Sequence, residues 1–364
     1  MPNPLLRIEN LSIAFDDTPV VHALSLTLNA GETLAIVGES GSGKSVSALG
    51  MINLLPSNAT VKGERWLGDT DLSTLTQDQW NDVRGNRVGF IFQEPMTSLN
   101  PLHRVGKQIG EALRLHQGLR GQTARQRCKA LLQQVKLPRP EELLDAWPHQ
   151  LSGGQRQRVM IAMAIANNPS LLIADEPTTA LDVTVQQEIL ALLRELRDHH
   201  AMGMLFISHD LNLVRRHADR ICVMHQGRIQ EIGPVEQVFQ HPQSDYTKAL
   251  LAAEPEGRPQ AIKQAPPLLT ARQLSVSFKR PKTGLFKRQP PAFVAVQPTD
   301  FQITPGETLG IVGESGSGKT TLASAVMRLV TSQGDVTLGN DKLSSLSGDD
   351  LRRQRHRFQM VFQD

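Results

Sequence analysis

One segment of the chain occurs twice. It starts at Gly31 as GETLAIVGESGSGKS and again at Gly306 as GETLGIVGESGSGKT. Similarity continues upstream, where NLSIAF ends at Phe15 and QLSVSF ends at Phe278. It also continues downstream, where FIFQ ends at Gln93 and MVFQ ends at Gln363. A repeat of this length predicts two homologous domains, for which 364 residues are sufficient.

The repeat sets the expected domain boundaries. Residues 1–253 form the first domain, residues 254–267 are a linker rich in Pro, Glu and Gln, and residues 268–364 belong to the second. Measured against the first copy, the second has no counterpart to anything that follows Gln93. A fragment, a premature stop and a degenerate second domain all remain open as explanations.

The repeated segment contains a phosphate-binding motif. A short apolar run, residues 34–37, has the composition of a buried parallel strand and is followed by a match to GxxxxGK[ST]. Glycines permit a turn whose backbone N–H groups face phosphate oxygens, and a helix is expected from Val46. Lys44 is expected to reach the β- and γ-phosphates, and the Ser45 hydroxyl to bind Mg²⁺. The predicted ATP-binding residues of this loop are Gly38, Glu39, Ser40, Gly41, Ser42, Gly43, Lys44 and Ser45.

The second copy repeats the same loop with threonine in the last position. Its predicted ATP-binding residues are Gly313, Glu314, Ser315, Gly316, Ser317, Gly318, Lys319 and Thr320, and Thr320 is the counterpart of the Mg²⁺ ligand Ser45. A glycine-rich turn without a ligand is the structural alternative, but two full matches make it improbable.

Two carboxylates follow a second apolar run, residues 171–174. Asp175 is placed to hold Mg²⁺ through water if this strand lies beside the phosphate loop, and Glu176 can polarise an attacking water. Between the loop and these carboxylates stands LSGGQ, residues 151–155, just before a helical pattern that starts at Arg156. Ser152 and the glycine amides would form an anion-binding cap there, although an ordinary helix N-cap has the same appearance.

These motifs together resemble the ATP-binding cassette (ABC) ATPase family over nearly the whole chain. The resemblance implies an α/β fold of the P-loop NTPase type, with a mostly parallel core sheet, an antiparallel β subdomain and a helical subdomain between Gln93 and Leu151. This domain is expected twice in tandem, and the second copy is incomplete. It also implies that ATP and Mg²⁺ are bound and that ATP is hydrolysed. Family roles then fall on the following residues: Phe15 and Phe278 stack on adenine; Gln93 and Gln363 bind Mg²⁺ or water; Ser152, Gly153, Gly154 and Gln155 form the signature that acts on ATP held by the opposite domain; Asp182 belongs to the D-loop; Glu176, His209 and Gln93 are catalytic.

The subfamily is suggested by two further stretches. QEPMTSLNP, starting at Gln93, and HPQSDYTKAL, starting at His241, resemble the dipeptide and oligopeptide import ATPases, and two cassettes in one chain are similar to the fused ATPases of bacterial microcin C-type peptide importers. This resemblance implies two transmembrane permease subunits as partners and, through them, a periplasmic peptide-binding protein; the peptide cargo does not touch this chain. Some relatives carry an iron–sulfur cluster in the C-terminal extension. None is expected here, because no cysteine follows Tyr246.

Composition narrows the alternatives. Net charge is +3, aromatic residues are 4% of the chain, and no apolar stretch approaches the roughly 18 residues that cross a bilayer. We therefore expect a cytoplasmic protein that binds no nucleic acid. The resemblance implies that it is peripheral on the inner face of the cell membrane, where its permease partners lie. A soluble ABC protein acting on nucleic acid and a truncated chain that binds nucleotide without driving transport are the competing hypotheses. Because the second domain lacks a signature, self-association through the first cassette is expected to be needed for activity.

Overall fold

The computed structural model describes residues 3–94, 98–179, 181–253, 265–279, 291–314 and 316–362. The chain divides into two compact units, Met1–Pro255 and Glu256–Asp364. Each unit is described by itself below. None of the helices in the described ranges combines the length and the apolar character that crossing a membrane requires.

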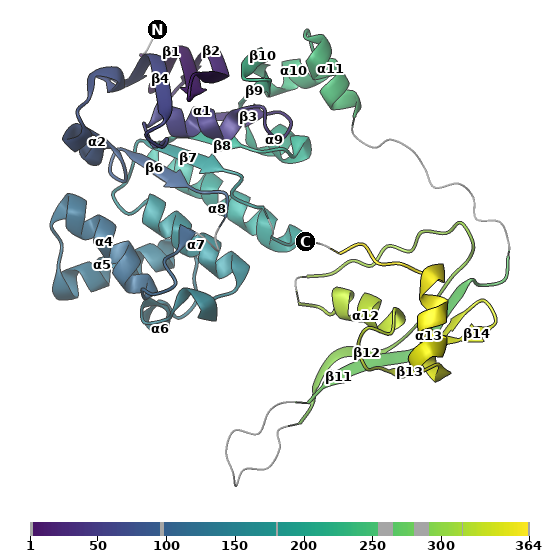
Figure 1. Cartoon of the computed structure of the whole chain (residues 1–364). Coiled ribbons are helices and arrows are strands. Elements are labelled where there is room, and N and C mark those ends of the chain that lie inside the picture. The colour runs from purple at the N-terminus through teal and green to yellow at the C-terminus, as the bar shows by residue number, and fades with distance from the viewer. Residues whose placement is uncertain are drawn as a thin grey trace. The chain divides into compact units, whose positions relative to one another are not determined.

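A six-stranded sheet forms the centre of the first unit (Figure 1). Its order is β10-β9-β3-β8-β7-β6, and every neighbouring pair is parallel except β9 and β10. The expected mostly parallel sheet is thus present. The strands are β3 (Thr33–Val37), β6 (Val88–Ile91), β7 (Leu171–Asp175), β8 (Gly203–Ile207), β9 (Arg220–His225) and β10 (Arg228–Pro234).

Both faces of this sheet are buried, as the continuous apolar runs predict. Successive side chains of a strand point to opposite faces, so Leu34 and Ile36 enter one hydrophobic cluster while Ala35 and Val37 enter the other. All four are fully buried. The first cluster also contains side chains of an antiparallel sheet and of α1 (Lys44–Met51), which together cover that face.

The antiparallel sheet has the order β2-β1-β4-β5. Its strands are β1 (Leu6–Phe15), β2 (Thr18–Leu28), β4 (Ala59–Leu67) and β5 (Thr70–Asp71), followed by the 3₁₀ turn η1 (Leu72–Thr74) and α2 (Gln77–Val83). Along β1 the buried residues alternate with half-exposed ones, which is the pattern of a sheet with one face on the core.

Helices lie on the opposite side of the core sheet and share one hydrophobic cluster with it. They include the helices between β6 and β7, where the sequence predicts a helical insertion. The set comprises α4 (Val105–Gln117), α5 (Gly121–Gln134), α6 (Pro140–Leu144), η2 (Pro148–Gln150), α7 (Gly153–Ala164), α8 (Val183–His200), α9 (Leu211–His217), α10 (Val235–Gln240) and α11 (Asp245–Ala252). The amphipathic segment 124–135 lies almost entirely within α5, whose Cys128, Leu131 and Leu132 are buried.

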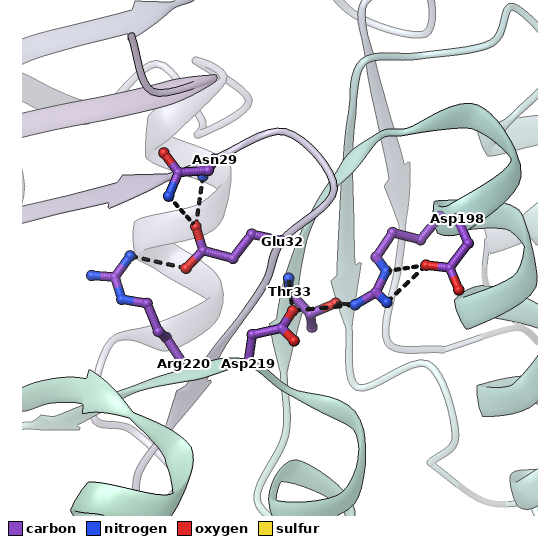
Figure 2. A network of polar contacts seen from close by, with 7 residues as sticks. Asn29, Glu32, Thr33, Asp198, Asp219 and Arg220 are labelled. Carbon is purple, nitrogen blue, oxygen red and sulfur yellow. Dashed lines mark hydrogen bonds and ion pairs between the residues drawn. The ribbon is translucent and has the colours of Figure 1, made fainter. Parts of the chain in front are cut away.

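Polar contacts tie the start of β3 to α8 and β9 (Figure 2). Asp219, directly before β9, accepts a hydrogen bond from the backbone N–H of Thr33 at 2.7 Å and one from Arg197 at 3.2 Å. Arg197, near the end of α8, also donates to the Thr33 hydroxyl at 2.7 Å. Arg220 donates to Glu32 at 3.0 Å. These contacts fix the amino end of the central strand, so its other end is held in position for the loop that follows.

The second unit contains the sheet β12-β11-β13-β14 and a short helical part. Its elements are β11 (Leu269–Phe278), β12 (Phe293–Ile303), α12 (Lys319–Val326), β13 (Gln333–Leu338), β14 (Asp341–Lys342), η3 (Leu343–Ser345), α13 (Gly348–Gln354) and η4 (Arg355–Arg357). The run before the second phosphate loop, residues 309–312, forms no strand, and Val312 is 93% exposed. In the first unit the equivalent β3 pairs with β8 and β9. The described residues of the second unit supply no parallel neighbour.

Gly89 in β6 provides a test of how tightly α7 packs on the core sheet. A Cβ at this position would lie 2.4 Å from the carbonyl oxygen of Ala164 in α7. We expect Gly89→Ala to destabilise the first unit by about 1–3 kcal/mol, because backbone atoms would have to move apart. Urea unfolding followed by tryptophan fluorescence measures this unit alone, since the three tryptophans of the chain, at positions 66, 80 and 147, all lie in it.

Gly110→Ala is the matched control. A Cβ there would be 3.7 Å from the Cys128 sulfur, an ordinary contact, and alanine favours the helix α4 by up to about 1 kcal/mol. Equal unfolding midpoints for the two variants would contradict the close packing of β6 and α7.

Candidate functional site

The first phosphate loop connects β3 to α1, and three of its glycines have a structural requirement. Gly41 has a φ of 80° and Gly43 a φ of 95°, a left-handed conformation that side chains disfavour. A Cβ on Gly38 would lie 2.1 Å from the carbonyl oxygen of Met224 in β9. The chain therefore makes the tight turn that the motif predicts, and α1 starts at Lys44 rather than Val46.

Lys44 lies inside this loop and is only 7% exposed. Its Nζ donates to the carbonyl oxygens of Gly38 and Glu39, both at 2.8 Å. Burial lowers the pKa of Lys44, and the charges of Glu176 and Asp175 oppose that shift. The hydroxyl of Ser42 is buried without a hydrogen-bond partner among the described residues. An ammonium group and an unpaired hydroxyl facing the turn fit an anionic ligand such as a phosphate chain.

Ser45 and Asp175 connect the loop to β7. The Ser45 hydroxyl donates to Oδ1 of Asp175 at 3.0 Å, and Asp175 is 5% exposed. Burial raises the pKa of Asp175 and the Glu176 charge adds to this, while the Ser45 hydrogen bond and Lys44 oppose it. A hydroxyl and a carboxylate next to a phosphate site are the hard oxygen ligands that Mg²⁺ prefers. These two residues could hold Mg²⁺ together with phosphate oxygens.

Glu176 follows directly and has an unusual backbone. Its φ is +45°, which for a non-glycine residue is strained by about 1–3 kcal/mol. Its Oε2 accepts hydrogen bonds from Gln93 Nε2 at 3.0 Å and Thr179 Oγ1 at 2.9 Å, and its Oε1 lies 3.1 Å from His209 Nδ1. Burial alone would raise the pKa of Glu176, but the hydrogen bonds from His209 and Thr179, with the charges of His209 and Lys44, lower it overall.

Sheet topology explains why distant residues meet here. Gln93 follows β6, Glu176 follows β7, His209 follows β8 and Lys44 follows β3. The carboxyl ends of parallel strands lie at one edge of a sheet, which is where ligands bind in folds of this type. A cavity of about 170 Å³ opens beside Glu176; its walls are Glu176, Thr178, Thr179, Leu181, Gln186, Ser208, His209, Asp210 and Leu213.

The signature residues begin α7. The hydroxyl of Ser152 accepts from the backbone N–H of Gln155 at 3.3 Å, and Gln155 Oε1 accepts from the N–H of Ser152 at 3.0 Å. This capping box starts the helix at Gly153, three residues before the expected Arg156. A Cβ on Gly154 would meet Val185 of α8 at 2.6 Å. Asp182 caps α8 through the N–H of Val185 at 3.0 Å.

Phe15 closes β1 and is half-buried against the antiparallel side of the core. Phe278 in the second unit is 45% exposed.

The second phosphate loop has the same closure as the first: Lys319 Nζ donates to the carbonyl oxygens of Gly313 and Glu314, both at 2.7 Å. Gly316, Ser317, Gly318 and Thr320 complete the described part of that loop and the start of α12. Ser315 and Gln363 lie outside the described residues.

Two features of the site were not singled out from the sequence. One is Thr179, whose hydroxyl donates to the Glu176 carboxylate. Thr179 lies three residues after Glu176, in a turn closed by a 3.1 Å hydrogen bond from the Thr179 N–H to the Glu176 carbonyl. This spacing is the sequence signal that could have indicated the contact. The β9–β10 hairpin also touches the phosphate loop, because the Gly227 N–H donates to the Ser42 carbonyl at 3.0 Å.

Comparison with known proteins agrees with this geometry. The ABC transporter family profile matches residues 21–179 and again residues 296–364. Among solved structures, the dimeric ATP-binding cassette MJ0796 bound to ADP and Pi superposes with a TM-score of 0.56 at 29% identity, covering 63% of this chain and 98% of that one. The first unit therefore has the ABC-type nucleotide-binding fold, with a mixed core sheet and an antiparallel subdomain.

Curated relatives extend over almost the whole chain. The peptidoglycan transport ATP-binding protein YejF of Agrobacterium fabrum strain C58 is 50% identical over 99% of this chain and 67% of its own length. An uncharacterized ABC transporter ATP-binding protein YejF of Escherichia coli K12 is 48% identical over 100% of the chain and 70% of its own length. The glutathione import ATP-binding protein GsiA of the same strain is 44% identical over 99% of the chain, which spans 64% of its length. The chain belongs to the family of ABC transporter ATP-binding proteins.

Proposed function

We propose that this chain is the ATP-hydrolysing subunit of an ABC importer for peptides or peptide-like compounds. The observation that carries the proposal is the convergence at one sheet edge of Lys44 in a closed phosphate loop, Asp175 bonded to Ser45, and a Glu176 carboxylate held by Gln93 and His209. This arrangement supplies a phosphate site, a metal site and a general base side by side.

ATP is the substrate that fits the loop. The N-terminus of α1 and the backbone amides of residues 38–45 offer several donors to phosphate oxygens. Lys44 now bonds to two loop carbonyls, so its ammonium group is held beside the phosphates it is to meet. Phe15 stacks on adenine in this proposal, and in a tandem second cassette Phe278 and Lys319 have the same roles.

Glu176 acts as the general base. Its lowered pKa keeps the carboxylate ionised, so it can accept a proton from the attacking water. In the described state Oε2 accepts from both Gln93 and Thr179, while Oε1 has His209 as its one printed partner among the described residues, so a water can approach the base at Oε1 or after Gln93 moves away. His209 has a side chain that is 66% exposed and can turn toward the γ-phosphate. Nucleotide binding would thereby release the base where it is needed.

Mg²⁺ would be held by Ser45 and Asp175 with Gln93 as an additional ligand, and by Thr320 and Gln363 in the second cassette. When bound, the ion neutralises charge on the phosphates. Asp175 contributes by orienting the Ser45 hydroxyl, which it already holds at 3.0 Å.

Cargo and partners are inferred from the relatives. One named relative transports peptidoglycan and another imports glutathione, and both compounds contain peptide bonds. We infer that two permease subunits, served by a periplasmic binding protein, carry the cargo while this chain stays at the cytoplasmic face of the membrane. Residues 1–253 would be the first cassette, 254–267 the linker and 268–364 the N-terminal part of a second cassette.

A complete site requires a second molecule or domain. The signature at residues 151–155 starts α7, which Figure 1 places with the helical layer rather than with α1. In the described structure, the hydrogen bonds of Ser152 are with Gln155 and Arg156 of its own helix. The signature occurs once in the 364 residues. We propose that Ser152, Gly153, Gly154, Gln155 and Asp182 of one first cassette act on ATP bound by another.

Two substitutions separate binding from hydrolysis. Glu176→Gln keeps the size of the side chain but removes the base, so we expect ATP affinity to be retained and hydrolysis to fall by at least about 100-fold. Lys44→Ala removes the charge that faces the phosphates, so affinity itself should fall. Both are measured in a Lys319→Ala background, which silences the second loop, by calorimetric titration with MgATP and by phosphate release. An equal loss of affinity in both variants would refute the roles assigned here.

The pH dependence of kcat tests the hydrogen bond from Thr179. Because a base must be ionised to work, a lowered pKa extends activity toward acidic pH. Thr179→Val removes a donor to the Glu176 carboxylate, so the Glu176 pKa should rise and the acid limb of the kcat profile should move to higher pH. Thr178→Val is the control: its hydroxyl accepts from Gln186, not from the base. An acid limb that stays in place in Thr179→Val would contradict the assignment.

Mixing two inactive variants tests the shared site. Ser152→Arg places bulk where the partner's γ-phosphate would lie, and Lys44→Ala disables phosphate binding. Each variant alone should be inactive, but an equal mixture should regain roughly a quarter of wild-type activity, since half of randomly formed dimers are mixed and each has one intact site. Wild-type specific activity should also rise with protein concentration. No rescue together with concentration-independent activity would show that a single molecule suffices.

A further inference from the structure

One arginine side chain connects the segment that leads into β6 to the carboxyl end of α1. Arg84, the residue directly after α2, donates from Nε to the carbonyl oxygen of Ile52 at 2.9 Å and from Nη2 to the carbonyl oxygen of Asn53. Both carbonyls follow the last residue of α1, at the negative end of the helix dipole. A guanidinium group supplies two donors and a positive charge at this point.

Aromatic packing holds this guanidinium group in place. It lies over the ring of Trp80, 5.0 Å from the centroid, and Trp80 is only 2% exposed. Arg65 of β4 also lies over this ring, at 5.7 Å, and donates to the carbonyl oxygen of Gly50 at 2.8 Å. Trp80 belongs to the hydrophobic cluster that contains Met51 of α1 and Val88 of β6. The end of α1 and the start of β6 are therefore packed around one buried ring.

The second unit repeats the contact. Arg355 directly follows α13, as Arg84 follows α2, and it donates to the carbonyl oxygen of Arg328 at 3.4 Å. Arg328 is the second residue after α12, and Asn53 is the second residue after α1. Their φ angles are 55° and 54°. The same arginine contact thus accompanies the phosphate-loop helix in both copies, although the residues that accept it differ.

The position of β6 in the sheet explains why such a contact matters. β6 is four residues long, stands at the end of the strand order and pairs with β7, and Gln93 follows its last residue by two positions. An edge strand this short has few hydrogen bonds to hold it, so it is displaced more easily than a central strand. Helix α1 starts at Lys44 in the phosphate loop, and its other end is bonded to Arg84. A series of contacts therefore connects the phosphate loop to Gln93 through α1, Arg84 and β6.

We propose that Arg84 is a positioning residue for hydrolysis, which fixes Gln93 relative to the phosphate loop by holding the start of β6 to the end of α1. This inference rests on the proposed function, because it takes Gln93 as a residue that acts on the general base Glu176. Gln93 Nε2 donates to the Glu176 carboxylate at 3.0 Å, so a displacement of β6 alters that contact. A role for Arg84 as a helix cap alone would instead affect stability, or ATP affinity through α1.

Arg84→Ala removes both hydrogen bonds and is studied in the full chain with Lys319→Ala. We expect kcat to fall about tenfold, because a small misplacement of a reacting group is costly. KM for MgATP should change by less than about twofold, because Lys44 keeps its own contacts within the loop. The urea midpoint should fall. Arg84→Lys retains a charge and a donor for one carbonyl, so it should restore part of kcat.

Arg87→Ala is the matched control. Arg87 belongs to the same segment and also donates two hydrogen bonds, to the Thr70 hydroxyl at 2.8 Å and to the Leu67 carbonyl oxygen at 3.0 Å. These bonds hold the segment to the antiparallel sheet rather than to α1. We expect Arg87→Ala to lower the urea midpoint as Arg84→Ala does, but to leave kcat within about twofold of the parent.

A double-mutant cycle shows whether Arg84 acts through Gln93. In a Gln93→Ala background, slow hydrolysis is followed by the release of radiolabelled phosphate. There Arg84→Ala should lower kcat by less than about twofold, because the side chain that it positions is absent. The loss of urea stability should persist in this background, since the hydrogen bonds to α1 do not involve Gln93.

The outcomes are distinct. An unchanged kcat in Arg84→Ala, with or without a raised KM, overturns the inference and leaves the proposed function intact. Equal losses of kcat in Arg84→Ala and Arg87→Ala also overturn it, because that pattern is a general loosening, as does a tenfold loss that persists without Gln93. Failure of the Lys319→Ala parent to hydrolyse ATP would overturn both the proposed function and this inference. A loss of kcat that is confined to Arg84→Ala and requires Gln93 supports the positioning role.

Discussion

Parallel pairing of β3, β8 and β7 in one register is the constraint on which the site depends. Ile207 at the end of β8 is opposite Ile36 of β3 on one side and Asp175 of β7 on the other. Because of this pairing the three strands end beside one another, so the loops that follow them also start side by side. The 3.0 Å hydrogen bond between Ser45 and Asp175 depends on this alignment, because the two residues are far apart in sequence. A shift of β3 by one residue would exchange Leu34 and Ile36 with Ala35 and Val37 between the two hydrophobic clusters, so the different side-chain volumes packed on the two faces oppose it.

At this edge of the sheet, charged side chains are stabilised by one another and by hydrogen bonds rather than by water. Lys44 and Asp175 are nearly fully buried, and burial disfavours the charged form of both, as the directions of their pKa shifts indicate. Each is ionised more easily because the other is near. Glu176 differs, since hydrogen bonds from neutral and basic side chains lower its pKa despite burial. The pKa values of the two adjacent carboxylates thus shift in opposite directions, because hydrogen bonds and nearby charges outweigh burial at Glu176 and do not at Asp175.

Local sequence patterns predicted the helices and strands better than the tertiary contacts that form the site. The apolar runs at 34–37 and 171–174 lie within β3 and β7, because fully buried strands need continuous apolar residues. The start of α7 was misplaced by three residues, since its two glycines are poor helix formers and the capping box outweighs them. The left-handed backbone of Glu176 and the contact of Gly227 with Ser42 have no local signal. Both follow from tertiary packing, which a single sequence does not specify.

The two phosphate loops have the same backbone geometry although their surroundings differ. Equivalent glycines have nearly equal φ angles: 151° and 157° at Gly38 and Gly313, and 95° at both Gly43 and Gly318. Each lysine bonds to the same two carbonyl positions of its own loop. The two loops thus close in the same way, although among the described residues the first alone follows a paired strand. The burial of the two lysines differs, because Lys44 is buried while Lys319 is half-buried. Burial removes Lys44 and Asp175 from water, and this desolvation strengthens their interactions with nearby charges. A desolvated site of this kind can stabilise the charge that develops during phosphate transfer, in addition to binding the phosphate.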